Sequence, residues 1–192
     1  MKKQKEKLVI ITGSSGSGKD SVIEGLQKQG LDFCWVITTT SREKRKNENE
    51  GKPYYFKSRE EFEEMIKNDE LLEHEEIYGN YYGSTVEEVE GCFSKNELTV
   101  FKIDPTGART IKKKFPESFV IFITPPSLEI LEKRLKNRGT EKPEEIKRRL
   151  DKVRKEMEIS KEFDGVVANE EGKLDETVEK VLIMIRKYAN MK

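Results

Sequence analysis

The segment at residues 8–29 constrains the fold of this chain more than any other. Residues 8–12 (LVIIT) are apolar and β-branched, which predicts a buried strand, and a helical pattern runs to about residue 29. Between them lies Gly13-Ser-Ser-Gly-Ser-Gly18-Lys19, whose glycines let successive backbone N–H groups face an anion at the helix N-terminus. A strand, a glycine-rich turn and a helix in this order indicate an α/β domain that binds phosphate groups.

This turn matches the first seven positions of the phosphate-binding loop pattern, in which Lys19 supplies a point charge to the β and γ phosphates. A plain Gly/Ser-rich turn is the alternative, but the strand before it and the helix after it favour phosphate binding. The eighth position, normally Ser or Thr holding Mg²⁺, is Asp20. A carboxylate is a good Mg²⁺ ligand, yet it adds negative charge beside phosphates. Asp20 is therefore either a metal ligand or a partner of the helix dipole. Ser21 points about 100° away and cannot replace the missing hydroxyl.

The rest of the chain alternates strand and helix patterns. A β-rich segment is predicted at residues 33–40 and strands at 53–56, 98–103, 118–124 and 166–168, with a hairpin at 71–82. Helices are predicted at residues 58–67, 85–93, 128–139 and 174–185, and around the apolar stripe Ile146, Leu150, Val153 and Met157. Ser58 and Glu61 form a capping-box pattern at the start of the first of these helices. Alternation in both halves predicts a parallel sheet covered on both faces, interrupted by an inserted subdomain.

Composition excludes several classes of protein. The 192 residues suit one α/β domain, and 37 basic against 37 acidic side chains give a formal net charge of zero, which argues against a general nucleic-acid binder. No apolar run is long enough to cross a bilayer, and the N-terminus has no signal-peptide pattern, so a cytoplasmic protein is expected. Cys34 and Cys92 stand outside any paired motif and there is one histidine, so neither a disulfide framework nor a zinc site is expected. The oligomeric state is left open.

Several further motifs occur in a fixed order. They are Tyr54-Tyr-Phe56, Glu70-Leu-Leu-Glu73, Gly79-Asn-Tyr-Tyr-Gly-Ser84, Ile103-Asp104-Pro-Thr-Gly107-Ala108, Pro125-Pro-Ser-Leu128, Arg134-Leu-Lys-Asn-Arg138-Gly-Thr140 and Arg148-Arg149-Leu150. Together with the glycine-rich turn, they resemble the guanylate kinase family over residues 8–188. The resemblance implies a single domain of P-loop NTPase type: a core at residues 8–33, 95–126 and 165–190, a GMP-binding insert at about 34–92 and a helical lid at about 127–164.

The resemblance also implies an activity, the transfer of the γ-phosphate of ATP to GMP or dGMP with Mg²⁺. The residues implied at the ATP site are Gly13, Ser14, Ser15, Gly16, Ser17, Gly18, Lys19, Asp20, Ser21 and Asn169. Arg138 and Arg149 match lid arginines that close over the phosphates. Together with Lys19 and Arg42 they are the candidate catalytic residues, and Asp20 is the candidate metal ligand.

The implied GMP site consists of Thr38, Arg42, Arg45, Tyr54, Glu73, Tyr82, Ser84 and Asp104. The planar forks of the two arginines suit a phosphate, and the two tyrosines match the hydroxyls that complete that grip. Guanine presents hydrogen-bond donors at N1 and N2, so carboxylates at Glu73 and Asp104 suit it, with hydroxyls from Thr38 and Ser84. Outside this resemblance, the arginines read as a solvated charged loop and Glu73 as a surface glutamate.

The chain departs from the family at one point. The family has an acid two residues before Asp104, where this chain has Lys102. The hypothesis is that Asp20 and Lys102 are a compensating charge swap and form an ion pair, as opposed to two independent changes. A separation well beyond about 6 Å between the two charges would reject it.

Two other functions are compatible with the sequence. The Gly-Lys-Asp-Ser turn resembles that of ribose bisphosphate kinases, although a sugar phosphate would not need the guanine-binding set. A nucleotide-binding or protein-binding module that lost catalysis is the other, but such modules usually lose the glycines and the lysine, and Gly13, Gly18 and Lys19 are present here.

Overall fold

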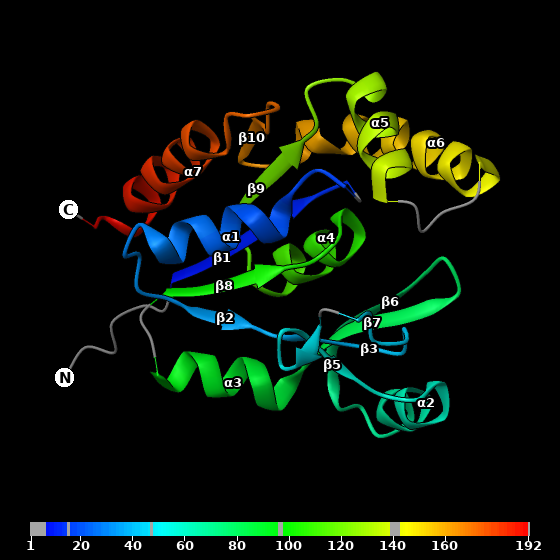
Figure 1. Cartoon of the computed structure of the whole chain (residues 1–192). Helices are drawn as coiled ribbons and strands as arrows, with labels where there is room; N and C mark the ends of the chain where they lie inside the picture. The colour runs from blue at the N-terminus through cyan, green and yellow to red at the C-terminus, as the bar shows by residue number, and fades with distance from the viewer. Residues whose placement is uncertain (1–6, 15, 47, 96–97, 139–142, 192) are drawn as a thin grey trace.

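The computed structural model describes residues 7–14, 16–46, 48–95, 98–138 and 143–191 (Figure 1). Its first sheet has the strand order β10-β9-β1-β8-β2, and every neighbouring pair is parallel. The strands are β1 (Lys7–Gly13), β2 (Cys34–Val36), β8 (Leu98–Lys102), β9 (Phe119–Thr124) and β10 (Gly165–Ala168). The three central strands are almost wholly buried, as near-continuous apolar sequences require, which confirms the predicted parallel sheet.

Helices cover both faces of this sheet. α1 (Lys19–Lys28) and α7 (Leu174–Ala189) pack against one face, and α3 (Val86–Lys95) and α4 (Pro105–Lys114) pack against the other. Alternate residues of β1 divide between the two layers, Val9 and Ile11 facing α1 and α7 while Leu8 and Ile10 face α3 and α4. No helix in the described ranges is long and apolar enough to cross a membrane.

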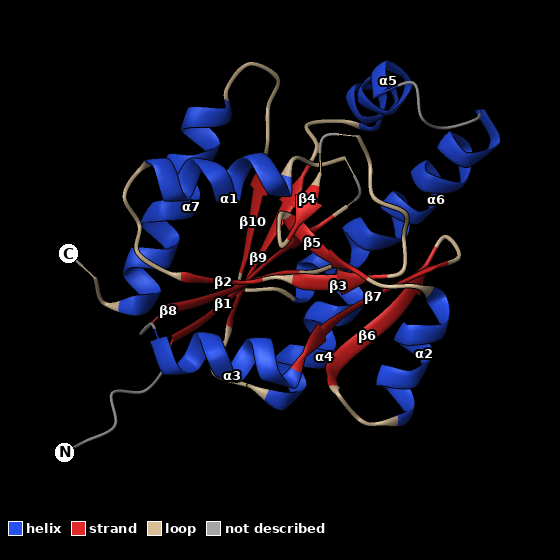
Figure 2. Ribbon diagram, turned by 60° about the horizontal axis from the view of Figure 1, so that its bottom comes forward, coloured by secondary structure: helices blue, strands red, loops and turns tan. Residues whose placement is uncertain are grey.

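A second, mixed sheet lies beyond the β2 edge of the first (Figure 2). Its strands, in spatial order, are β4 (Asn49–Glu50), β5 (Pro53–Phe56), β3 (Thr38–Thr40), β7 (Asn80–Thr85) and β6 (Leu71–Ile77), and α2 (Arg59–Lys67) packs against β7. The capping box of α2 is confirmed, since Ser58 Oγ accepts from the Glu61 N–H at 3.0 Å and Glu61 accepts from the Ser58 N–H at 2.6 Å.

The β-rich segment predicted at residues 33–40 forms two strands, one in each sheet. The strand conformation is interrupted at Ile37. On one side of it, β2 pairs with β8 in the first sheet, and on the other, β3 pairs with β5 and β7 in the second. The residues on both sides of the break are β-prone, and only the choice of pairing partner separates them. Ile37 is consequently one of the two places where the chain passes between the sheets.

A helical hairpin stands across from the second sheet (Figure 1). It consists of α5 (Leu128–Arg138) and α6 (Pro143–Ile159), followed by a 3₁₀ turn at Ser160–Glu162. Leu131, Leu135, Ile146 and Val153 form its apolar cluster, as the stripe predicted. Met157 is a correction, because it is 40% exposed while Glu156 is only 6% exposed. At this turn α6 faces the polar cavity described below, so a carboxylate takes the inward position.

The two cysteines are also a correction. Cys34 of β2 and Cys92 of α3 form a disulfide, with their Cα atoms 5.3 Å apart and a sequence separation of 58 positions. No local sequence motif predicts this pairing, because the two side chains meet only when α3 packs against β2.

Candidate functional site

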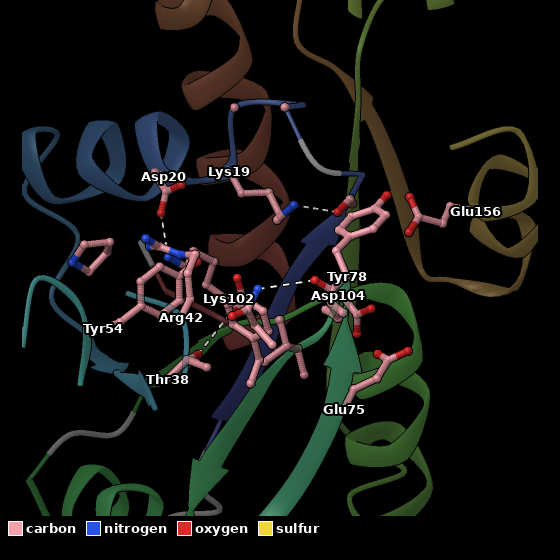
Figure 3. A pocket seen from close by; sticks show the side chains of 18 of the residues that line it. Lys19, Asp20, Thr38, Arg42, Tyr54, Glu75, Tyr78, Lys102, Asp104 and Glu156 are labelled. Atoms are coloured by element: carbon pink, nitrogen blue, oxygen red, sulfur yellow. Dashed lines mark hydrogen bonds and ion pairs between the residues drawn. The ribbon is translucent and has the colours of Figure 1, made fainter. Parts of the chain in front are cut away.

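A cavity of about 290 Å³ opens where the carboxyl ends of β1 and β8 meet the second sheet and α6 (Figure 3). Ligands of open α/β sheets bind at this edge. Residues predicted for ATP and residues predicted for GMP line the same cavity: Gly13, Gly16, Gly18, Lys19, Asp20, Ser21, Thr38, Arg42, Arg45, Tyr54, Glu73, Tyr82 and Asp104. The fold therefore brings two predicted sets from distant parts of the sequence into one site.

The glycine-rich turn adopts a backbone that only glycine permits. Gly13 has φ +139°, and a Cβ there would lie 2.0 Å from the carbonyl oxygen of Ile123. Gly18 has φ +92°, and a Cβ there would lie 2.2 Å from Nδ2 of Asn169. The turn ends at the N-terminus of α1, so its N–H groups and the helix dipole together make an anion site.

Lys19 is folded back onto this turn. Its ammonium donates to the carbonyl oxygens of Gly13 at 2.5 Å and Ser14 at 2.9 Å. Burial lowers the pKa of Lys19 from its ordinary value. The lysine therefore lies at the centre of the predicted phosphate site, where an anion would strengthen its charged form.

Asp20 and Lys102 form the ion pair that the sequence comparison suggested. The distance from Lys102 Nζ to Asp20 Oδ1 is 2.6 Å, well inside the limit set for the hypothesis. The Lys102 side chain is 3% exposed and that of Asp20 57% exposed. Burial by itself lowers the pKa of Lys102, but Tyr54 and Asp20 outweigh it and raise this pKa. The ion pair is confirmed, while its origin as a compensating swap stays a hypothesis.

The same pair bears on Mg²⁺. Proteins usually bind Mg²⁺ through one or two carboxylates together with substrate phosphates. Asp20 is a carboxylate in the expected place, but Lys102 already neutralises it. Within the described part of the chain, no three His, Cys, Asp or Glu side chains are placed to hold a metal ion. These residues therefore do not fit a preformed Mg²⁺ site.

The arginine side of the cavity is organised by Glu48. Arg42 Nη2 donates to both carboxylate oxygens of Glu48, at 2.8 and 2.9 Å, and the backbone N–H of Arg45 donates to one of them at 2.9 Å. The Arg42 guanidinium also lies 5.5 Å from the ring centroid of Tyr54. Burial opposes the charge on Glu48, but these hydrogen bonds lower its pKa overall. Arg42 and Tyr54 thus form one cationic and aromatic wall, and Tyr82 meets the Tyr54 ring edge-on at 5.8 Å.

The opposite wall is acidic and buried. Glu73 is 6% exposed, and Ser84 Oγ donates to it at 2.8 Å from within the protein. Burial raises the pKa of Glu73 to about 7. Ser84 does not itself line the cavity, and its contribution to this wall is the hydrogen bond that it donates to Glu73. Thr38 Oγ1 donates to the Lys102 carbonyl at a long 3.4 Å, and Asp104 caps α4 by accepting from the Gly107 N–H at 2.9 Å.

Several residues that line the cavity were missed by the sequence analysis, among them the polar side chains of Glu48, Glu75, Tyr78, Lys152 and Glu156. Glu75 follows Glu73 by two positions on β6, and residues two apart on a strand share a face, which is a signal the sequence did contain. Burial and a hydrogen bond with Asp104 raise the pKa of Glu75 to about 8. Lys152 Nζ lies 3.6 Å from Asp104 and 3.7 Å from Glu156, so α6 completes this wall.

The remaining predicted residues have mixed outcomes. Asn169 is buried and its Nδ2 donates to the Ser17 carbonyl at 2.8 Å, so it supports the glycine-rich turn, and its adenine contact stays a prediction. Ser14 and Ser17 are buried. Ser15 and the side chains of Arg138 and Arg149 lie outside the described residues.

Comparisons with known proteins agree over nearly the whole chain. The family model described as guanylate kinase matches residues 5–188. A guanylate kinase of Prochlorococcus marinus subsp. pastoris is 44% identical over 184 residues, which is 96% of this chain and 99% of that protein. The crystal structure of a guanylate kinase from Anaplasma phagocytophilum has a TM-score of 0.74 at 30% identity, covering 95% of this chain and 85% of its own.

A more distant likeness concerns the fold alone. The crystal structure of a shikimate kinase from Aquifex aeolicus has a TM-score of 0.51 at 17% identity, covering 95% of this chain and 98% of its own. The glycine-rich turn and the two-sided cavity agree with the family match and with the close relatives. By sequence and by fold, this chain belongs to the guanylate kinase family.

Proposed function

We propose that this protein transfers the γ-phosphate of ATP to GMP or dGMP, giving ADP and GDP or dGDP. The observation that carries the proposal is the shared cavity, which has an anion-binding turn on one side and an arginine–carboxylate set on the other. The ATP phosphates would lie along the turn beside Lys19. The acceptor phosphate would lie at Arg42, Arg45, Tyr54 and Tyr82.

Guanine would be read at the acidic wall. Its N1 and N2 groups are donors, and Glu73 is a buried acceptor whose orientation is fixed by Ser84. A buried acceptor left unpaired costs free energy, so a base without matching donors is rejected. Asp104 is the second acceptor, held at the N-terminus of α4 by its cap to Gly107. This set supports GMP over other acceptors.

Phosphoryl transfer does not require a general base or a nucleophile from any single side chain. Phosphoryl transfer depends on positioning the two phosphates in line and on stabilising the charge between them. Lys19 and Arg42 would stabilise that charge from the two sides of the cavity. We assign the second sheet to the GMP-binding insert and α5–α6 to the lid, with Arg138 and Arg149 as its charged groups. Mg²⁺ is proposed to enter with ATP, which supplies phosphate ligands that the described residues do not replace.

One observation favours a second candidate. Because Lys102 neutralises Asp20 at the donor side, a nucleotide-binding module with weak catalysis is compatible with this geometry. The glycine-rich turn argues for an active enzyme, because it holds the ammonium of Lys19 at the predicted phosphate site through hydrogen bonds to the carbonyls of Gly13 and Ser14. A ribose bisphosphate acceptor is less compatible, since it lacks the base donors that Glu73 is proposed to accept from, and Ser84 would remain the hydrogen-bond donor to that carboxyl.

A coupled ADP-release assay tests these functions. GMP, dGMP, AMP, UMP and ribose 1,5-bisphosphate are offered in parallel with ATP and Mg²⁺. Turnover on GMP and dGMP alone is the expected result. Turnover on the sugar phosphate would move the protein to another acceptor. No turnover on any of them, with GMP still binding in calorimetry, would support the weakly catalytic module.

A further inference from the structure

Lys102 is a buried cation in the middle of the cavity that the reaction proposed above does not use. Its side chain is 3% exposed, and its Nζ lies 2.6 Å from Asp20 and 4.3 Å from the ring centroid of Tyr54 (Figure 3). It lines the same cavity as Lys19 and Arg42. The ammonium therefore lies between the glycine-rich turn and the tyrosine assigned to the acceptor phosphate.

Neutralising Asp20 does not by itself require this arrangement. Asp20 is 57% exposed, and a carboxylate at that exposure is well solvated by water. Lys102, by contrast, is desolvated, and a buried ammonium is costly unless its donors are used. An ammonium has three donors, and the partners found for this one are Asp20, Tyr54 and the ring of Trp35, whose centroid lies 5.1 Å from Nζ. The costly member of the pair is thus the one placed deep in the cavity.

Tyr54 connects Lys102 to the acceptor side. Arg42 Cζ lies 5.5 Å from the Tyr54 ring centroid and Lys102 Nζ lies 4.3 Å from it, so two cations adjoin the same ring. Glu48 takes two hydrogen bonds from Arg42 and reduces the positive charge that Arg42 offers to a ligand. A dianionic phosphate beside Tyr54 therefore gains from a second cation.

We propose that Lys102 is a further binding residue for the acceptor phosphate, with Asp20 as the positioning residue that holds its ammonium beside Tyr54. The inference rests on the proposed function, because it takes GMP as the acceptor. The competing explanation is structural: Lys102 only neutralises Asp20, and the phosphate is bound by the arginines and tyrosines alone.

Calorimetry with GMP and with guanosine, without ATP or Mg²⁺, separates the two explanations. Guanosine has the same base and lacks the phosphate. In Lys102→Met we expect the GMP affinity to fall by roughly 10- to 100-fold, the size expected for a hydrogen bond to a charged group, while guanosine affinity is unchanged. Lys102→Arg is expected to restore part of the GMP affinity. Lys28→Met, an exposed lysine at the end of α1, is the matched control and should bind both ligands as the unaltered protein does.

The double variant Asp20→Asn/Lys102→Met decides between the explanations. It removes both charges, so a structural lysine is no longer needed and GMP affinity would recover, which would overturn the proposal. We expect the double variant to bind GMP as weakly as Lys102→Met does. It also serves if the single variant does not fold, because it removes as well the negative charge that Lys102 neutralises in the unaltered protein. Thermal unfolding of each variant monitors this.

The remaining outcomes distinguish a failure of this inference from a failure of the proposed function. If the unaltered protein binds GMP and Lys102→Met binds it equally well, the inference fails and the proposed function stands. An equal loss of GMP and guanosine affinity would also overturn the inference, since it would mean that the whole cavity is disturbed. If the unaltered protein does not bind GMP, both the proposed function and the inference fail.

Discussion

In the proposed function, the two sides of the cavity would bind phosphate by different means. The donor side is a single turn of consecutive residues, from Gly13 to Lys19, that presents backbone N–H groups and one half-buried lysine. The acceptor side is assembled from side chains on β3, β5, β6 and β7, the loop that carries Arg42, and Asp104 at the start of α4. Backbone groups recognise phosphate in any polyphosphate, whereas placed side chains distinguish one acceptor from another. The donor side would therefore supply the chemistry of transfer, and the acceptor side would supply selectivity for the substrate.

The cations on the two sides also differ in their partners. Lys19 donates to two backbone carbonyls, while Arg42 donates to the carboxylate of Glu48. A neutral carbonyl holds a cation less strongly than a carboxylate does. Lys19 is therefore the easier of the two to move onto a phosphate, and Arg42 is held in a fixed position. Substitutions on the two sides should accordingly alter different kinetic constants.

The largest effect is expected at Lys19. In Lys19→Met the kcat should fall by about 100- to 1000-fold, the range seen when one preorganised charge-stabilising donor is removed. The GMP affinity should stay unchanged, because the substitution lies on the donor side. Steady-state kinetics and GMP calorimetry measure the two quantities. A parallel loss of GMP affinity would contradict the division of the cavity into two sides.

A smaller effect of the opposite kind is expected at Glu73. In Glu73→Gln the kcat/KM for GMP should fall by roughly 10- to 100-fold, because an amide presents an NH₂ donor where the guanine donors need an acceptor. Most of the loss should appear in KM, with turnover of saturated enzyme largely kept. Glu76→Gln, which changes an exposed glutamate on the same strand, is the matched control. An unchanged preference for GMP over AMP would exclude Glu73 as a base-reading residue.

The acidic wall should also make base binding depend on pH. Burial raises the pKa of Glu73 to about 7, so the carboxylate that accepts from guanine is lost as pH falls below that value. Guanosine affinity should rise by about tenfold from pH 6 to pH 8. Guanosine is the right probe because the phosphate of GMP titrates near pH 6. Glu75 titrates in the same cavity, with a pKa of about 8, so a flat profile in Glu73→Gln is needed to assign the change to Glu73.

The raised pKa of Glu73 should also make the free energy of unfolding fall as pH rises. A carboxyl whose pKa is higher in the folded state than in the unfolded state loses stability as pH rises from about 4.5 to about 7. At pH 8, Glu73→Gln should be more stable than the unaltered protein, by up to about 3 kcal/mol, and the gain should vanish near pH 4. Denaturant unfolding at the two pH values measures this. A gain of equal size at both would point to packing in place of ionisation.

The smallest effect on activity is expected for the disulfide. Cys34 and Cys92 lie on β2 and α3, away from the residues that line the cavity. In Cys34→Ser/Cys92→Ser the free energy of unfolding should fall by about 2–4 kcal/mol, because the unfolded chain loses a crosslink, while GMP turnover at 25 °C should stay within about twofold. A large loss of turnover in a folded double variant would connect the disulfide to the geometry of the cavity.

Local patterns predicted most of the fold. The order of strand, turn and helix at residues 8–29, the capping box at Ser58 and the hairpin of β6 and β7 all follow from neighbours in sequence. α4 was not predicted, although Asp104 followed by Pro105 is a helix-start signal that could have revealed it. The break at Ile37 left no comparable signal, because both of its halves are β-prone and only the pairing partner differs.

The site was predictable to a different degree on its two sides. The donor turn is contiguous, so its residues and even its required glycines can be read from the chain. The acceptor set was predicted only through a resemblance, because arginines in a charged loop and glutamates in a charged strand have no distinguishing local pattern. Glu48 and Glu156 were missed for the same reason, and Met157 was placed inward because a helical stripe cannot reveal what its last turn faces.

The sequence by itself determined which segments are strands and helices and where a phosphate-binding turn must lie, since these depend on side chains a few residues apart. Only the tertiary structure decided that Cys34 meets Cys92, that Glu73 is buried against Ser84, and where the ammonium of Lys102 sits. The proximity of Lys102 to Asp20 could be suspected from their exchanged charges, but its place beside Tyr54 could not. Such contacts depend on how two sheets and a helical hairpin come together, and the free energies that set this arrangement are spread over the whole core.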